Sequence, residues 1–349
     1  MNFDLSEEQR LLADSLGGYL GKRYDRDAGD RTHWSALAEL GVIGAFFDPT
    51  RGGFGGSAFD VAVVFEQIGR AVAIEPFLGT LMAGTAMGDD VPEALVTGTE
   101  LFAFAHQEAA LRHDPDTVLT TAVPDGAGWR LTGHKGPVRG IEQADHIVVT
   151  SIGPTGLASF LVDPASEGVS IRGYPMIDGG RGGELVLDNT PARLVGPKDG
   201  ASAIARTLMI GTVALCWEAV GIMDHLRDAT LDYMRIRTQF GRAIGSFQVL
   251  QHRMADLAID IEQARSAAIN AAAAIDAGRR DAARVVSAAK YTIGTTGTRV
   301  AEESIQIHGG IAMTWEFPSS LHAKRLIQIG QEHGDADHHL ARFVALAAA

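Results

Sequence analysis

The chain has 349 residues, of which 46% are hydrophobic and 21% charged, as is ordinary for a globular protein of two or three domains. Its formal net charge is −13 and no basic run stands out, which argues against nucleic acid or an anionic membrane as a partner. The single cysteine, Cys216, excludes an internal disulfide and predicts a cytoplasmic protein. The longest uncharged runs, 76–87 and 207–217, are too short to span a membrane, so no membrane insertion is expected.

Residues 1–100 are predicted to form an N-terminal helical domain. Ser6, followed by two glutamates, is typical of a helix N-cap, and apolar residues then recur at helical spacing. Further helices are expected at 34–40 and 58–73. The glycine-rich segment 52–56 is predicted to be a turn, because no Lys-Ser or Lys-Thr follows it as in a phosphate-binding loop.

Residues 101–196 have a different pattern and predict a small β-domain. Short stretches rich in β-branched and aromatic residues are separated by Gly, Pro and Asp at intervals of roughly eight to twelve residues. The sequence contains no G-x-G-x-x-G motif, so a Rossmann site for NAD is not expected. The predicted strands are 117–122, 129–132, 146–151, 158–162 and 183–187.

Residues 197–349 return to a helical pattern and predict a C-terminal bundle. After Ser246, apolar residues form one stripe at helical spacing while charged residues lie off it, as in a bundle helix. The stripe consists of Leu250, Met254, Leu257, Ile261, Ala264 and Ala268. The whole chain is therefore expected to be mainly α with a central small β-domain.

Three short motifs in this C-terminal half combine groups that suit a dinucleotide. They are Arg237-Thr-Gln-Phe240-Gly241, Phe247-Gln248 and Gln306-Ile-His-Gly309-Gly310. A guanidinium pairs bidentately with a pyrophosphate, an aromatic face can cover adenine, a side-chain amide can bond a ribose or base edge, and glycine lets backbone approach closely. Each residue also has a plainer interpretation, as a surface charge, a hydrophobic anchor, a solvated first-turn amide or a helix C-cap.

The order and spacing of these motifs resemble the acyl-CoA dehydrogenase family of flavoproteins, over nearly the whole chain. The resemblance implies an N-terminal helical domain, a β-barrel-like middle domain and a C-terminal four-helix bundle. It implies FAD bound across a subunit interface, an acyl-CoA thioester oxidised to the 2-enoyl-CoA in acyl-CoA catabolism, and an electron-transfer flavoprotein or similar acceptor. The residues that it places against FAD are Arg237, Phe240, Gln248, Gln306, Gly309 and Gly310.

The sequence departs from the family where the catalytic base is expected. Abstraction of the α-proton requires a positioned base, but the position of the family's glutamate before a glycine carries His333. The other position that the family uses falls near Gly211, which has no carboxylate either. Glu332 is one residue away, a shift that rotates a helical side chain by roughly 100°. Glu332 is the first candidate for the base and His333 the second, and the remaining alternative is that the chain has no base of its own.

The segments that the resemblance places beside the flavin ring also depart from the family. Where an aromatic and a hydroxyl residue are usual after T-G-x-K, Lys135 is followed by Gly-Pro-Val and Arg139. The earlier flavin-facing segment, 105–108, reads Ala-His-Gln-Glu. The residues expected at the adenine are retained, whereas those expected at the flavin ring and the catalytic base are changed. This pattern predicts a chain that completes the FAD site of a homologous dehydrogenase subunit. We therefore expect a heterotetramer, with a homotetramer as the alternative.

A metal-dependent hydrolase is the rival from another class. Its ligands would come from the cluster at 333–339, where Asp335 and His339 are four residues apart and could share a helical face. No third well-spaced ligand is evident elsewhere in the sequence, and Asp335 also suits a helix N-cap. We therefore predict no metal site.

Overall fold

The computed structural model describes residues 5–26, 31–115, 117–314 and 316–347. Contacts divide the chain into two compact units, one comprising Met1–Arg23, Ala62–Ala73 and Thr212–Ala349, the other Tyr24–Val61 and Ile74–Gly211. This division groups segments from distant parts of the sequence. The three domain ranges expected from the sequence, 1–100, 101–196 and 197–349, remain predictions.

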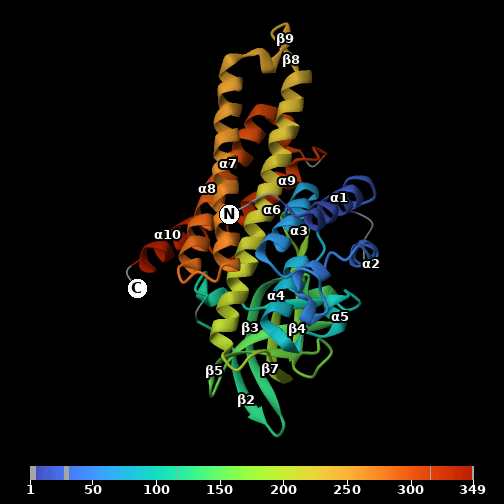
Figure 1. Cartoon of the computed structure of the whole chain (residues 1–349), viewed down its shortest axis with the longest axis vertical. Coiled ribbons are helices and arrows are strands. Elements are labelled where there is room, and N and C mark those ends of the chain that lie inside the picture. Colours follow the sequence, from blue (N-terminus) through green and yellow to red (C-terminus); the bar gives the residue numbers. More distant parts are fainter. Residues whose placement is uncertain (1–4, 27–30, 116, 315, 348–349) are drawn as a thin grey trace. The chain divides into compact units, whose positions relative to one another are not determined.

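The N-terminal region is helical, as predicted. Its α-helices are α1 Glu7–Lys22, α2 Thr32–Glu39, α3 Ala58–Ala71, α4 Phe77–Met87 and α5 Glu93–Val96 (Figure 1). Ser6 caps α1 through a reciprocal pair of bonds with Gln9, which confirms the predicted N-cap. The glycine-rich segment is a tightly packed turn, since a Cβ at Gly53 would lie 2.0 Å from the Phe47 carbonyl oxygen.

Seven strands form one sheet that closes on itself. They are β1 Phe102–Ala105, β2 Thr121–Asp125, β3 Gly128–Arg139, β4 His146–Gly153, β5 Gly156–Val162, β6 Val169–Pro175 and β7 Arg181–Val195. The order is β1-β4-β2-β3-β7-β5, β6 pairs with β7, and a further pairing of β4 with β5 completes a ring. This closure gives the barrel-like β-domain that the resemblance implies.

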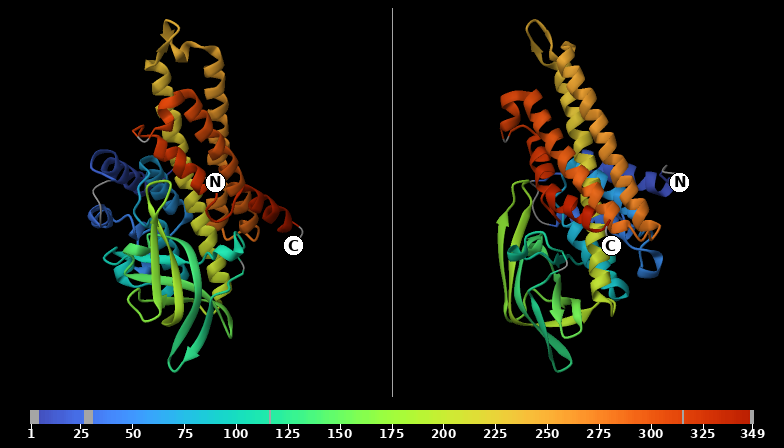
Figure 2. Two further views of the ribbon diagram at one scale, coloured as in Figure 1. Left: turned by 180° about the vertical axis from the view of Figure 1, so that it is seen from behind. Right: turned by 90° about the vertical axis from the view of Figure 1, so that its left-hand side faces the viewer.

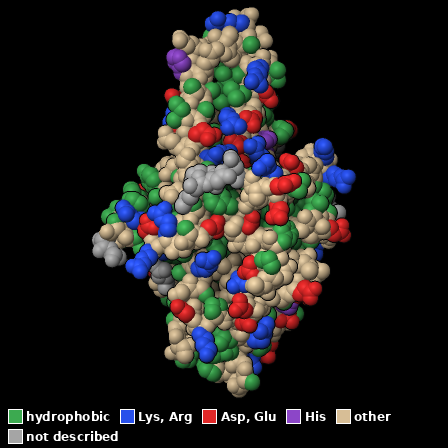
Figure 3. Space-filling model, viewed as in Figure 1, with side chains coloured by type: hydrophobic (Ala, Val, Ile, Leu, Met, Phe, Trp, Pro, Cys, Tyr) green, Lys and Arg blue, Asp and Glu red, His purple; other side chains and the backbone are tan. Residues whose placement is uncertain are grey.

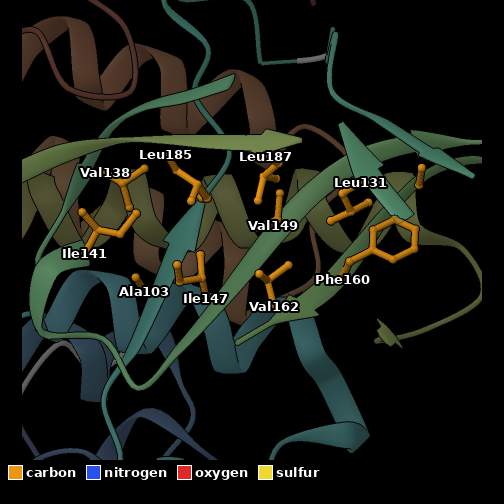
Figure 4. Close-up of a cluster of buried hydrophobic side chains, with 12 residues drawn as sticks. Ala103, Leu131, Val138, Ile141, Ile147, Val149, Phe160, Val162, Leu185 and Leu187 are labelled. Carbon is orange, nitrogen blue, oxygen red and sulfur yellow. The ribbon is translucent and has the colours of Figure 1, made fainter. Parts of the chain in front are cut away.

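The inner faces of these strands build a continuous apolar core. In Figure 4, Leu131 of β3, Val149 of β4, Phe160 of β5 and Leu185 of β7 point toward one another between the strands. Each of these four side chains is 1% exposed or less. A rigid barrel of this kind fixes the segments between its strands, including the one that follows β1.

The C-terminal region contains three long helices and two shorter ones. These are α6 Gly200–Ile236, α7 Gln248–Asp276, α8 Ala282–His308, α9 Ser320–Ile329 and α10 Ala336–Ala345. Figure 2 shows α7 and α8 antiparallel and side by side. The predicted stripe on α7 is buried from Met254 to Ala268, while Leu250, at the start of the helix, is only partly buried. The predicted helical bundle is thus confirmed.

The length and composition of α6 would also allow it to cross a membrane. However, 67% of its most apolar window is buried inside the structure, as in the core helix of a folded domain. This single helix is therefore weak support for a membrane span.

Candidate functional site

The first motif lies on a tight hairpin that joins α6 to α7. Strands β8 Thr238–Gln239 and β9 Arg242–Ala243 pair with each other, and the Ile244 N–H donates to the Arg237 carbonyl at 2.8 Å. Phe240 and Gly241 form the turn with positive φ angles of 53° and 78°. Glycine accepts such a conformation freely but phenylalanine rarely adopts it, so the backbone of this turn is strained at Phe240.

This hairpin leaves its functional groups in water. The Phe240 side chain is 92% exposed and contacts Phe247 edge-on, with ring centroids 6.1 Å apart. The Arg237 side chain is exposed and forms no ion pair with any residue that the structure describes. Gln248 is an exposed first residue of α7, and Figure 3 shows basic side chains at this end of the bundle. The Phe240 ring and the Arg237 guanidinium are thus both accessible to another molecule.

The third motif, Gln306–Gly310, ends α8, which returns toward the hairpin end of the bundle. Gln306, Gly309 and Gly310 are exposed, and a Cβ built on either glycine meets no atom within 4 Å. The Gly309 N–H also caps the helix on the Ile305 carbonyl, so capping and ligand contact are compatible here. His308 is instead buried between Tyr233 and Phe317, with ring centroids 4.5 and 4.7 Å away.

Glu332 lies in the turn between α9 and α10, where its carboxylate forms an ion pair. Its Oε1 accepts from Arg325 Nη1 at 2.7 Å and from Gln328 Nε2 at 3.1 Å. Arg325 also binds Glu218 bidentately, at 2.6 and 2.7 Å, and both of these side chains are 5% exposed. A carboxylate held by a guanidinium is a weaker base, because the bond stabilises its charged form. These contacts are those of a structural carboxylate.

His333 follows in the same turn and is partly buried. Its Nδ1 lies 3.3 Å from Thr212 Oγ1, next to Gly211, the other family position for the base. Burial lowers the pKa of His333 to about 4, so its imidazole is neutral near pH 7. Such a group can take part in hydrogen bonds but is too weak a base to remove an α-proton readily.

The residues of the β-domain that the resemblance places beside the flavin are bonded to one another. Lys135, fully buried in β3, donates to Glu108 Oε1 at 2.7 Å and to the His106 carbonyl at 3.0 Å. Burial, offset by Glu108, lowers the pKa of Lys135 to about 8. Glu108 also accepts the backbone N–H groups of Leu119 and Thr120, at 2.8 and 3.0 Å. Every charged group in this network therefore has a partner within the chain.

Two further polar groups of this region are also bonded. The His106 ring lies 2.9 Å from Thr150 Oγ1 through Nδ1 and 3.2 Å from the Pro115 carbonyl through Nε2. The Arg139 guanidinium forms an ion pair with Asp178, which is 2% exposed. The residues that stand where the resemblance expects flavin contacts are thus engaged within the chain.

Comparison with known proteins decides the family. Residues 6–91 match the model of the acyl-CoA dehydrogenase N-terminal domain, and residues 198–331 match that of the acyl-CoA dehydrogenase C-terminal domain. The chain is 30% identical to the acyl-CoA dehydrogenase IpdE2 of Mycobacterium tuberculosis, over 91% of each chain. The chain belongs to the acyl-CoA dehydrogenase family.

Solved structures agree with this assignment. The Tcur3481-Tcur3483 steroid ACAD G363A variant superposes with a TM-score of 0.91 and 30% identity, over 98% of each chain. The ChsE4-ChsE5 complex of Mycobacterium tuberculosis has a TM-score of 0.88 over 100% of this chain and 99% of that chain; at 24% identity it shows the fold only. The fold and the family that the motifs suggested are both confirmed.

FAD is the cofactor of this acyl-CoA dehydrogenase family chain, and part of the described surface fits it. The unpaired Arg237 guanidinium suits a pyrophosphate, and the exposed Phe240 ring suits adenine. The open backbone at Gly309 and Gly310 leaves room for close approach. The groups at His106, Lys135 and Arg139, by contrast, are already bonded to other residues of the chain.

The metal-dependent hydrolase finds no support in the structure. The described residues contain no group of three or more His, Cys, Asp or Glu side chains placed to hold a metal ion. Asp335 caps α10 by accepting the His338 N–H at 2.8 Å, as its N-cap interpretation predicted. His339 Nε2 lies 3.0 Å from the His333 carbonyl and donates to it.

Sequence reasoning missed the buried charges Lys290 and Arg325. Lys290 lies in α8 among buried residues spaced three and four apart, such as Val286 and Ile293. A lysine on an apolar helical stripe is unusual, because burying an ammonium is costly unless it is hydrogen-bonded. That position within the stripe is the signal that could have found it.

Proposed function

We propose that this chain is a subunit of an FAD-dependent acyl-CoA dehydrogenase that introduces the α,β double bond of an acyl-CoA thioester. Family membership supports an oxidoreductase acting on acyl-CoA. The observation that carries the cofactor role is the unpaired Arg237 guanidinium beside the 92% exposed Phe240 ring. When bound, FAD supplies the acceptor for the hydride that leaves the β-carbon.

The chain's own residues would hold the cofactor. Arg237 would pair with the pyrophosphate, Phe240 would cover the adenine, and Gln248 and Gln306 would bond its polar edges. The backbone at Gly309 would approach the ligand closely. All of these are binding roles, and they leave the α-proton to be removed by another group.

A specific contrast favours the second candidate, in which this chain completes the site of a catalytic partner. The groups on the adenine side are exposed, whereas Glu332 is engaged by Arg325 and Lys135 by Glu108. The name of the Tcur3481-Tcur3483 structure, at 30% identity, pairs two different proteins. We therefore favour a heterotetramer with a homologous dehydrogenase subunit that supplies the base, over a homotetramer.

Electron-acceptor identity and location are part of the same proposal. The caffeyl-CoA reductase-Etf complex subunit CarC of Acetobacterium woodii is 26% identical over 80% of each chain, and its name places it with an Etf. We propose an electron-transfer flavoprotein or a similar protein as acceptor. A cytoplasmic location remains a proposal that rests on the single cysteine.

Expression of the chain with and without a candidate partner tests the assembly. We expect the co-expressed proteins to purify as one yellow complex with two flavins per four chains, since each FAD would be shared by two different subunits. The chain expressed by itself should be poorly soluble or free of flavin, because an obligate interface leaves its apolar surface uncovered. A soluble homotetramer with four flavins that oxidises an acyl-CoA would refute the shared-site proposal while preserving the dehydrogenase activity.

A further inference from the structure

The turn that carries Glu332 and His333 has an unusual backbone. His333 has a φ of 57° and Gly334 a φ of 111°, so two successive residues lie outside the region that L-amino acids prefer. A Cβ at Gly334 would lie 2.6 Å from His338 Cδ2. A strained conformation of this kind persists only where the surrounding structure holds it.

Lys290 of α8 bridges the two ends of this turn. It is 1% exposed, and its Nζ donates to the Ile329 carbonyl at 2.8 Å and to the Gly334 carbonyl at 2.9 Å. Ile329 is the last residue of α9, where carbonyls lack intrahelical partners and a cation is favourable. The ammonium therefore holds together the two ends of the segment 329–334, which lies between α9 and α10. We call this arrangement the Lys290 clasp.

A second side chain supports the same turn from the other side. His339 of α10 is buried, and its Nε2 donates to the His333 carbonyl at 3.0 Å. That bond fixes the proton on Nε2 while the ring is neutral, and its Nδ1 is buried with no hydrogen-bond partner in the described structure. Burial lowers the pKa of His339 to about 3, so the ring stays neutral and this bond is kept at ordinary pH.

Charged side chains of both signs surround the turn. Lys290, Arg325 and Glu218 are buried, Glu332 is partly buried, and the Asp335 carboxylate also acts on Lys290. A lysine needed only for packing could be replaced by methionine without loss, because buried charges seldom add net stability. The bonds of Lys290 to backbone rather than to a carboxylate indicate that it specifies a conformation.

We propose that Lys290 is a positioning residue, which fixes the turn so that Glu332 meets Arg325 and the His333 imidazole meets Thr212. The consequence for chemistry rests on the proposed function, since this turn stands at the family's position for the base. The clasp itself depends only on contacts within the chain, so it can be tested without flavin or substrate.

Lys290→Met is the decisive variant, studied in the full-length chain with its partner where one is needed for solubility. We expect amide hydrogen exchange at residues 330–334 to accelerate about tenfold or more, since the turn would open locally. NMR titration should show the pKa of His333 rising from about 4 toward the ordinary value, both because the opened turn lets water reach the ring and because the Lys290 charge that also lowers this pKa is gone, so amide exchange is the readout that decides.

Val286→Ala provides the matched control. Val286 is 3% exposed and lies one turn earlier on α8, so the variant loses core packing without touching the clasp. Equal changes in exchange and in His333 titration for both variants would reduce Lys290 to a packing role and overturn the proposal. If Lys290→Met does not fold, Lys290→Gln, whose amide keeps N–H donors but no charge, decides between the same outcomes with a smaller effect.

A failed flavin-binding test would not change the result of this experiment. Exchange and titration report on the clasp, whereas flavin stoichiometry reports on the hairpin and the partner. The two proposals therefore fail separately.

Discussion

The hairpin between α6 and α7 leaves its polar groups in water, whereas the β-domain ties its own polar groups to one another. Arg237 and Phe240 face solvent on a tight turn. Lys135 and Glu108 form a fully buried ion pair, and Arg139 is engaged by Asp178. The family resemblance places both regions at the cofactor, yet the polar groups of one are exposed and those of the other are bonded within the chain.

The comparison shows that an exposed charge and a buried, paired charge have different capacities to bind a ligand. Exposed groups on a rigid support retain their binding capacity and lose little freedom when a ligand arrives. Buried paired groups cannot bind a ligand in the same way, because separating either partner would leave an uncompensated charge in an apolar interior. The polar groups of the hairpin thus remain available to a ligand, whereas those of the β-domain are bonded within the chain.

The largest effect should come from breaking the pair in the β-domain. Glu108→Ala leaves the Lys135 ammonium buried without its carboxylate and removes the acceptor of two backbone N–H groups. We expect a loss of about 3–5 kcal/mol in the free energy of unfolding, measured by denaturant titration.

The control for this variant is Glu142→Ala, in the same β-domain. Glu142 pairs with Arg181 at the surface, where both side chains are well exposed, so its removal should cost about 1 kcal/mol or less. Equal losses for the two variants would mean that the buried pair is no more important than a surface ion pair.

The hairpin should show the opposite behaviour, with an effect on binding and little on folding. Arg237→Ala removes one charge-assisted contact worth roughly 1.5–3 kcal/mol, so FAD affinity of the assembled protein should fall about tenfold to a hundredfold. Flavin fluorescence titration measures the affinity. Arg235→Ala is the control, because Arg235 is an exposed neighbour whose partner among the described residues is Asp232. Unchanged affinity in the Arg237 variant would remove Arg237 from the site.

The fold could be predicted and the motif at 237–241 identified from the sequence because their signals are local. The α7 stripe and the motif around Phe240 each lie within a few turns of chain. Strand β1, with four buried residues, shows no alternation and was missed. Strand β2 was predicted to start at residue 117 but starts at Thr121, because Glu108 captures the N–H groups of residues 119 and 120.

The buried pairs could not be predicted in the same way. Lys135 is 27 residues from Glu108, and Arg325 is 107 residues from Glu218. Pairing at such distances depends on the folded backbone, which the spacing of side chains along the chain does not encode. The same reason explains why the contact of Glu332 with Arg325 could not be foreseen when Glu332 was named as a candidate base.

The third test uses pH to examine the turn. Burial lowers the pKa of His333 to about 4 and that of His339 to about 3, below the value of about 6.5 expected in the unfolded chain. Below pH 6.5 the unfolded chain takes up protons that the folded chain refuses, so stability present above pH 6.5 is lost as the pH falls toward 4. Each histidine should contribute at most about 1.4 kcal/mol per pH unit.

Denaturant unfolding at several pH values between 7.5 and 4.5 measures this slope. His339→Gln is the control, because an amide can still donate to the His333 carbonyl but does not titrate. The slope should become shallower in that variant. A stability that is flat between pH 6.5 and 5 in the original chain would show that neither ring is held neutral by burial.

The smallest effect is expected from Glu332→Gln, and it decides whether this chain carries a base. A positioned base contributes on the order of 10²–10⁴ in rate, so loss of a true base would be unmistakable. The amide of glutamine still accepts a bond from Arg325 through its oxygen, so the turn should survive the change. Because Glu332 is held by Arg325 and the proposed base lies on the partner, we expect acyl-CoA turnover of the assembled complex to stay within about threefold of the original. A drop of about a hundredfold with FAD content and substrate binding preserved would instead make Glu332 the base and give this chain an active site of its own.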